Sequence, residues 1–221
     1  MVLSEIAARL RRHGLILRGG FHPNKDEAGL DGCGTVLLVG NAGPAMWKAF
    51  APHAGEGGDP LDRWTEHVVE PLAEAFGGKA VYPFDRPHQP FQRWAGRAEG
   101  LEPSPLGILI HPEYGLWHAY RAALLFAERL DLPPRPAPDM PCESCAEKPC
   151  LKTCPAGAVS EAAYDVAACA AHIVRRGADC LAIGCHARNA CPVGAAYRYQ
   201  PAETAFHMRA FARFLPRAAT A

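Results

Sequence analysis

The sequence predicts a mixed α/β (α+β) core followed by a separate cysteine-rich domain. Short apolar runs typical of strands alternate with amphipathic stretches typical of helices over the first 140 residues. A proline-rich segment, 132–141, then interrupts the chain, and eight of the nine cysteines lie beyond it. We therefore expect a core at 1–131, a connecting strap at 132–141 and a cysteine-rich domain at 142–221.

The first elements of the core follow from apolar periodicity and from a helix-start signal. Residues 1–20 are expected to form a short amphipathic helix, whose apolar face consists of Leu3, Ile6, Leu10 and Leu15. Residues 35–40 form a short apolar run, which is typical of a buried strand. Pro44 suits the first turn of a helix that extends to Phe50.

The second half of the core repeats this alternation. Asp59-Pro60 begins a helix to about Phe76, with apolar residues on one face at Trp64, Val68, Val69, Leu72 and Phe76. Residues 80–84 and 106–110 are predicted to be strands. A long helix is expected at 117–130, where alanine and leucine dominate.

Charge and hydropathy exclude several classes of protein. The chain of 221 residues has 23 basic and 23 acidic residues, so its formal net charge is zero and no nucleic-acid partner or acidic membrane surface is expected. No apolar run approaches the length of about 18 residues that a membrane span needs. Residues 1–20 lack the continuous apolar region of a secretory signal, and the cytoplasm is the expected compartment.

The strap is defined by its prolines. Residues 132–141 contain five prolines, which remove backbone donors and restrict φ. Such a segment neither continues a helix nor joins a central strand. We expect it to be extended and stiff.

The cysteine pattern indicates iron–sulfur chemistry. Cys142, Cys145, Cys150 and Cys154-Pro155 form a C-x2-C-x4-C-x3-C-P run, and a second set consists of Cys169, Cys180, Cys185 and Cys191-Pro192. Thiolates of cysteine hold iron–sulfur clusters, and two-cluster ferredoxins use C-x2-C-x2-C-x3-C-P runs. The chain resembles these proteins, with two residues added before Cys150 and with Arg188 near a position where a cysteine is expected. We expect two 4Fe-4S clusters.

The ferredoxin resemblance also implies how the thiols are shared. In such proteins the last cysteine of each run binds the other cluster. Carried over to this chain, the rule assigns one cluster to Cys142, Cys145, Cys150 and Cys191. It assigns the other to Cys154, Cys169, Cys180 and Cys185.

The sequence leaves two alternatives to iron–sulfur clusters open for these cysteines. A structural zinc site also uses paired cysteines, although only Cys142 and Cys145 have the C-x2-C spacing of a zinc knuckle. Disulfides would require an oxidising compartment. Cys33, the one cysteine outside the cluster-type pattern, is expected to be structural.

Four short islands in the core resemble the CblC-type cobalamin-processing proteins. Residues 107–121, with His111-Pro112, Gly115, Trp117 and Arg121, are similar to the strand-turn-helix of that family. The other islands, in the same order as in the family, are 36–39 with Pro44-Ala45-Met46, Asp59-Pro60-Leu61-Asp62, and 131–135. Epoxyqueuosine reductase and the reductive dehalogenases join a related core to a ferredoxin tail, and this chain resembles a compact version of that arrangement.

The resemblance implies a nitroreductase-like core and a pocket for cobalamin with its lower base displaced. The residues it places at that pocket are Phe91, Trp94, Leu109, His111, Tyr114, Trp117, Tyr120 and Arg121. In the CblC family, the arginine that matches Arg121 contacts the glutathione carboxylate, a role suited to a planar guanidinium.

The sequence therefore predicts an iron–sulfur corrinoid-binding reductase. Such a protein would bind cobalamin as ligand or substrate and reduce it, or remove its upper ligand, with electrons from its clusters. An external reductase or ferredoxin would supply these electrons. Two alternatives stay open: a ferredoxin-type electron carrier that docks to a partner enzyme, and a corrinoid-dependent reductase of an organic substrate.

Overall fold

The computed structural model describes residues 2–25, 27–55, 57–175 and 179–214, and it divides into two compact units. Unit 1 comprises residues 1–101 and 118–138, and unit 2 comprises residues 102–117 and 139–221. The segment 102–117 thus groups with the cysteine-rich part of the chain. The three-part division predicted above stays a prediction, because compactness alone does not show which part folds independently.

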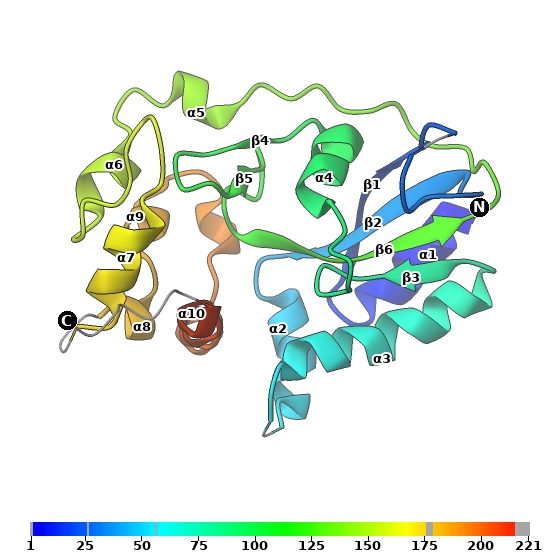
Figure 1. Ribbon diagram of the computed structural model, residues 1–221, viewed down its shortest axis with the longest axis horizontal. Helices are drawn as coiled ribbons and strands as arrows, with labels where there is room; N and C mark the ends of the chain where they lie inside the picture. Colours follow the sequence, from blue (N-terminus) through cyan, green and yellow to red (C-terminus); the bar gives the residue numbers. More distant parts are fainter. Residues whose placement is uncertain (1, 26, 56, 176–178, 215–221) are drawn as a thin grey trace. The chain divides into compact units, whose positions relative to one another are not determined.

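A four-stranded antiparallel sheet forms the centre of unit 1, with strand order β1-β2-β6-β3. The strands are β1 (Ile16–Phe21), β2 (Thr35–Ala42), β3 (Lys79–Val81) and β6 (His118–Phe126). Strand β2 is buried from Thr35 to Asn41, as expected for a central strand covered on both faces. Figure 1 shows the four strands side by side.

Helices cover the sheet of unit 1. They are α1 (Val2–Arg11), α2 (Ala45–Phe50), the short 3-10 helix η1 (Ala51–His53), α3 (Pro60–Ala75) and α4 (Phe91–Glu99). Helices α3 and α4 lie on opposite sides of the sheet (Figure 1). Their apolar faces supply Trp64, Leu72 and Trp94 to the core. The predictions of β2, α2 and α3 are confirmed to within two residues at each end.

The predicted helix at 117–130 is wrong, because this segment forms strand β6. Its alanines and leucines favour a helix when considered alone. In the sheet, however, β6 pairs with β2 along one edge and with β3 along the other. A strand buried on both faces needs a continuous apolar run, and pairing with neighbours outweighs the local preference.

Three other elements differ from the prediction in extent. The N-terminal helix ends at Arg11, and strand β1 follows, although its glycines at positions 19 and 20 hide the strand pattern. The strand predicted at 80–84 is limited to β3, and the strand predicted at 106–110 is limited to β5 (Leu109–Ile110). The strap has no helix or strand from 132 to 140, in agreement with its prolines.

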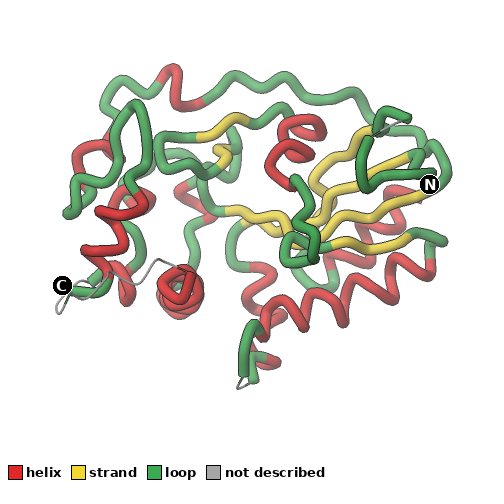
Figure 2. Tube along the Cα trace, in the orientation of Figure 1, coloured by secondary structure: helices red, strands yellow, loops and turns green. Residues whose placement is uncertain are grey.

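Unit 2 consists of short helices and one small hairpin. The hairpin pairs β4 (Glu102–Pro103) with β5. The helices are α5 (Pro141–Ser144), α6 (Pro149–Thr153), α7 (Val166–Ile173), α8 (Cys180–Ile183), α9 (His186–Asn189), the 3-10 helix η2 (Ala195–Tyr197) and α10 (Pro201–Phe214). Helix α6 packs against α9, and α8 packs against α10. Figure 2 shows how little of unit 2 is strand.

Within the described residues, no helix combines the length and the hydropathy that a membrane span requires.

A buried polar network links strands and helix in unit 1. Arg18 is 1% exposed, and its Nε donates to Glu99 of α4 at 2.9 Å. Its Nη1 lies 3.1 Å from Nδ1 of His118 and donates to the carbonyl of Asn41 at 3.5 Å. The Tyr120 hydroxyl also donates to Glu99. The network therefore ties β1, β2 and β6 to α4.

We expect Glu99→Gln to destabilise unit 1 by about 3 kcal/mol, because it leaves the Arg18 charge buried without its anion. Hydrogen exchange of the β6 amides during urea unfolding measures this cost. Glu5→Gln is the control, since the Glu5 side chain is 60% exposed in its pair with Arg9, and should cost less than about 0.5 kcal/mol. Equal stability of the two variants would show that the buried pair of Arg18 and Glu99 does not stabilise unit 1.

Candidate metal centre

Four thiols of unit 2 form a first cysteine group: Cys142, Cys145, Cys150 and Cys191. Pro141 begins the one-turn helix α5, which carries Cys142, and Cys145 lies at its end. The two residues added before Cys150 are accommodated by Lys148, which has a left-handed φ of 38° and caps α6. The two residues by which this run differs from the ferredoxin pattern thus lie at a tight turn that leads into α6.

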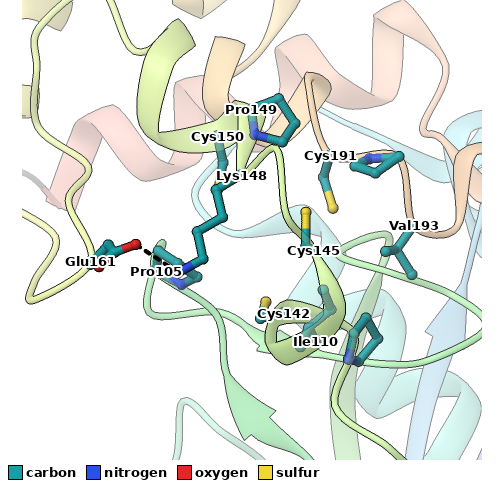
Figure 3. A pocket seen from close by; sticks show the side chains of 12 residues that line it. Pro105, Ile110, Cys142, Cys145, Lys148, Pro149, Cys150, Glu161, Cys191 and Val193 are labelled. Atoms are coloured by element: carbon teal, nitrogen blue, oxygen red, sulfur yellow. Dashed lines mark hydrogen bonds and ion pairs between the residues drawn. The ribbon is translucent and has the colours of Figure 1, made fainter.

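The first cysteine group surrounds a cavity of about 270 Å³. Figure 3 shows the sulfur atoms of Cys142, Cys145 and Cys191 facing this space. The remaining walls are mostly apolar, and they consist of Pro105, Ile110, Pro141, Lys148, Pro149, Glu161, Pro192 and Val193. Lys148 donates to Glu161 at 2.6 Å, so the charged part of the lining is an ion pair.

The electrostatics of this group favour a bound cation. Burial raises the pKa of the Cys142 thiol, and the neighbouring Cys191, Cys150 and Cys145 raise it further. Burial likewise raises the pKa of Cys150 and of Cys191. Four thiolates cannot remain charged together at such a site without positive charge between them, and a metal centre supplies it.

A second cysteine group consists of Cys154, Cys169, Cys180 and Cys185. These residues lie after α6, on α7, at the start of α8 and before α9. Burial raises the pKa of Cys180, and Asp179, Cys185, Cys169 and Cys154 raise it further. The pKa of Cys169 is also raised by burial, although the Tyr164 hydroxyl donates to its sulfur and opposes this shift.

Each group takes the last cysteine of the other run. Cys154 ends the first run but belongs to the second group, and Cys191 ends the second run but belongs to the first. The members of each group are those that the ferredoxin resemblance implies, while ligation itself stays a prediction. All nine cysteines are unpaired in the structure.

The width of the cysteine groups argues against a single zinc ion. Tetrahedral zinc with Zn–S bonds of about 2.3 Å holds its sulfurs about 3.8 Å apart. Among the described residues, the set of three or more ligand atoms within 4.8 Å of one another is Asp179, Cys180 and His186, which contains one thiol. Neither group of four thiols is that tight.

Four of the predicted corrin-pocket residues lie in unit 2: Leu109, His111, Tyr114 and Trp117. The His111 ring stacks on Tyr114 with centroids 4.1 Å apart, and its Nδ1 accepts hydrogen bonds from the backbone N–H groups of Glu113 and Tyr114. Trp117 is 1% exposed.

The other four lie in unit 1: Phe91, Trp94, Tyr120 and Arg121. Phe91 and Trp94 are buried on α4, and Trp94 packs against Phe21. Arg121 is the additional residue of a β-bulge, because Ala122 pairs with Val39 whereas Tyr120 pairs with Gly40. It faces Asp62 of α3 at 4.0 Å, whereas Tyr120 contacts Glu99 of α4. Their role at a corrin stays a prediction.

Sequence reasoning missed two polar groups near the cysteines. Tyr164 forms a hydrogen bond with a candidate ligand, and Glu203 is fully buried on α10. For Glu203 the sequence offered no local signal, because its burial depends on how α10 packs against α8.

Two solved structures share the fold of this chain. The epoxyqueuosine reductase from Streptococcus thermophilus has a TM-score of 0.54 and 16% identity, over 87% of this chain and 66% of that one. A selenomethionine-labelled epoxyqueuosine reductase has a TM-score of 0.58 and 13% identity, over 92% of this chain and 68% of that one. The chain thus spans about two thirds of the length of these proteins. At this identity the likeness shows the fold alone.

No protein-family model and no curated protein sequence matches the chain. The names nitroreductase-like and ferredoxin-like for its two parts therefore stay predictions.

A close backbone crossing joins the segment 102–117 to the last cysteine of unit 2. A Cβ at Gly115 would lie 2.0 Å from the carbonyl oxygen of Val193, and one at Gly194 would lie 2.3 Å from the backbone of Tyr114. Gly115 also has a left-handed φ of 58° and pairs with His111 in a β-bridge. The crossing places the two segments directly against each other beside Cys191.

We expect Gly115→Ala to destabilise unit 2 by about 2–4 kcal/mol, because the methyl group clashes with backbone and the φ is unfavourable. Gly107→Ala is the matched control, since Gly107 has a φ of 71° but no atom within 4 Å of the added Cβ. It should cost about 1 kcal/mol. Chemical denaturation compares them, and equal costs would show that the crossing is not tight.

Proposed function

We propose that this protein is an iron–sulfur reductase with a 4Fe-4S cluster at each of its two cysteine groups. The observation that carries the proposal is the set of eight unpaired, buried or half-buried thiols, gathered four and four and spaced too widely for one metal ion. The fold shared with structures named epoxyqueuosine reductase supports the reductase part. When bound, such clusters supply one-electron transfer.

The residues around the thiols suit this chemistry. Proline and aliphatic side chains, among them Ile110 and Val193, limit water at the first group. The backbone N–H of Val193 donates to the sulfur of Cys191, and the Tyr164 hydroxyl donates to Cys169. Hydrogen bonds to sulfur and restricted solvent are the features by which proteins set the potential of such centres.

We further propose that the electrons pass from the clusters to cobalamin, which is bound with its lower base displaced. The four collinear sequence islands and the apolar and aromatic character of the predicted pocket residues support it. An external reductase or ferredoxin is the proposed electron donor. A corrinoid-dependent reductase of an organic substrate would use the same parts, whereas an electron carrier would need no corrinoid.

We expect anaerobically purified protein to contain about eight iron and eight sulfide ions per chain. Cys154→Ser and Cys191→Ser should each remove about half of the iron, from different clusters. The double variant Cys154→Ser/Cys191→Ser should lose nearly all, whereas Cys142→Ser/Cys191→Ser should lose no more than Cys191→Ser alone, because both thiols belong to one group.

Iron and sulfide analysis with EPR spectroscopy measures these outcomes. Cys33→Ser is the control and should keep all the iron, since Cys33 donates to the carbonyl of Thr35 in unit 1. One zinc ion per chain without sulfide would refute the proposed function.

The corrinoid part predicts that the visible spectrum of added cobalamin changes to the base-off form on binding, and that reduced clusters then reduce it. Arg121→Lys should leave this reduction nearly unchanged, because the clusters and not a thiol supply the electrons. The double variant without clusters should bind cobalamin but not reduce it. An unchanged cobalamin spectrum with fully loaded wild-type protein would favour the electron carrier.

A further inference from the structure

Unit 2 contains a group of buried polar and aromatic side chains that the proposed function does not use. We call it the Glu203 cluster, and its members are Trp117, Arg188, Tyr199, Glu203 and His207. Glu203 is fully buried, and neither of its carboxylate oxygens has a hydrogen-bond partner among the described residues. The same holds for Nε of Arg188 and Nε1 of Trp117. Buried polar atoms without partners are costly and are retained where they have a task.

The members of the cluster form a continuous chain of contacts. Oε1 of Glu203 lies 4.0 Å from Nε2 of His207, one helical turn away. The Arg188 guanidinium lies 4.6 Å from the Trp117 ring and 4.8 Å from the Tyr199 ring. The Tyr199 ring in turn lies 5.5 Å from His207. A separation of 4.0 Å is too long for a direct hydrogen bond.

Helix α10, which carries Glu203, packs against the second cysteine group. One face of the helix carries Met208 and Phe211, which pack in the apolar cluster that contains Cys169 and Cys180. The Thr204 side chain packs against Gly184, which directly precedes Cys185 in sequence. Glu203 and His207 lie on the adjacent face, four residues apart. The helix that walls the second group therefore also carries the buried acid.

The surroundings allow Glu203 to exchange a proton near neutral pH. Burial raises its pKa to about 7, although the Arg188 guanidinium opposes the shift. The His207 side chain is 28% exposed, so it connects the buried carboxylate to solvent. Helix α8 contributes Cys180 and, before it, Asp179, whose carboxylate is paired with His186. Arg188 and His207 both face Glu203.

An added electron at the second group would raise the proton affinity of this carboxyl. A unit negative charge in a low-dielectric surrounding disfavours a second negative charge nearby, so the neutral acid becomes the stable form. Because burial already raises the pKa of Glu203 to about 7, a modest change in the local potential is enough to change its protonation. An exposed carboxylate, screened by water, would respond little.

We propose, on the basis of the proposed iron–sulfur function, that Glu203 is the proton acceptor coupled to electron entry at the second cysteine group. When an external one-electron donor reduces this centre, the Glu203 carboxylate takes up one proton from water through His207. One electron and one proton enter together, and charge balance is kept. When the electron leaves the second cysteine group, Glu203 releases its proton. The reduction that consumes the electron then consumes this proton as well.

Redox titration of the anaerobic protein, followed by EPR at pH values below and above 7, tests this coupling. At a fixed ambient potential, the ratio of reduced to oxidised second cluster should fall as the pH rises, by up to about tenfold per pH unit for one proton per electron. Glu203→Gln should abolish this dependence, and Glu203→Asp should retain it. Glu147→Gln is the matched control: its side chain is 89% exposed, so its loss should leave the pH dependence unchanged.

Reduction-induced infrared difference spectra provide a second readout. Wild-type protein should show the carbonyl stretch of a newly protonated carboxylic acid, shifted in heavy water and absent in Glu203→Gln. Iron and sulfide are measured in every sample. A protein without clusters refutes the proposed function. Loaded wild-type protein with a pH-independent ratio and no carbonyl band refutes the role of Glu203, whether or not the variants fold.

Discussion

The mutual repulsion of buried thiolates is the constraint on which the organisation of unit 2 depends. Eight thiols lie in two groups of four, and burial raises the pKa of five of them, Cys142, Cys150, Cys169, Cys180 and Cys191. Such groups are stable as ligands only with a cation among them, as in metal-dependent folds generally. The short helices α5, α6 and α8 fit this requirement, because each carries one cysteine, and α9 begins directly after Cys185.

The segment 102–117 contacts the first cysteine group and the residues around it. Ile110 of this segment lines the cavity of the first group. Gly115 of the same segment packs against the backbone of Val193. The segment also supplies Leu116, whose carbonyl accepts a hydrogen bond from Arg188 at 2.5 Å. Arg188 lies between Cys185 of the second group and Cys191 of the first in sequence. Its guanidinium stacks on Trp117 and Tyr199, so it joins three segments of the unit.

Unit 1 has a different kind of core. Its sheet is covered by helices on both faces, and most residues of its central strands are apolar. Its core also contains the Arg18 network, in which a buried guanidinium is satisfied by Glu99, His118 and Asn41. A buried ion pair of this kind adds little net stability but makes the pairing of β1, β6 and α4 specific. The bulge at Arg121 interrupts the same strand and turns its side chain toward Asp62.

Features that depend on local spacing could be predicted from the amino-acid sequence. The helices that begin at Pro44 and Asp59-Pro60, the strand at 35–40 and the extended strap could be predicted, since proline position and apolar period act over a few residues. The membership of the cysteine groups could be inferred from the C-P endings by resemblance. Only the tertiary structure decided that 118–126 is a strand, because the pairing with β2 and β3 involves residues about 40 to 90 positions away. It also decided the burial of Glu203, which depends on how α10 packs against α8 and which no local pattern records.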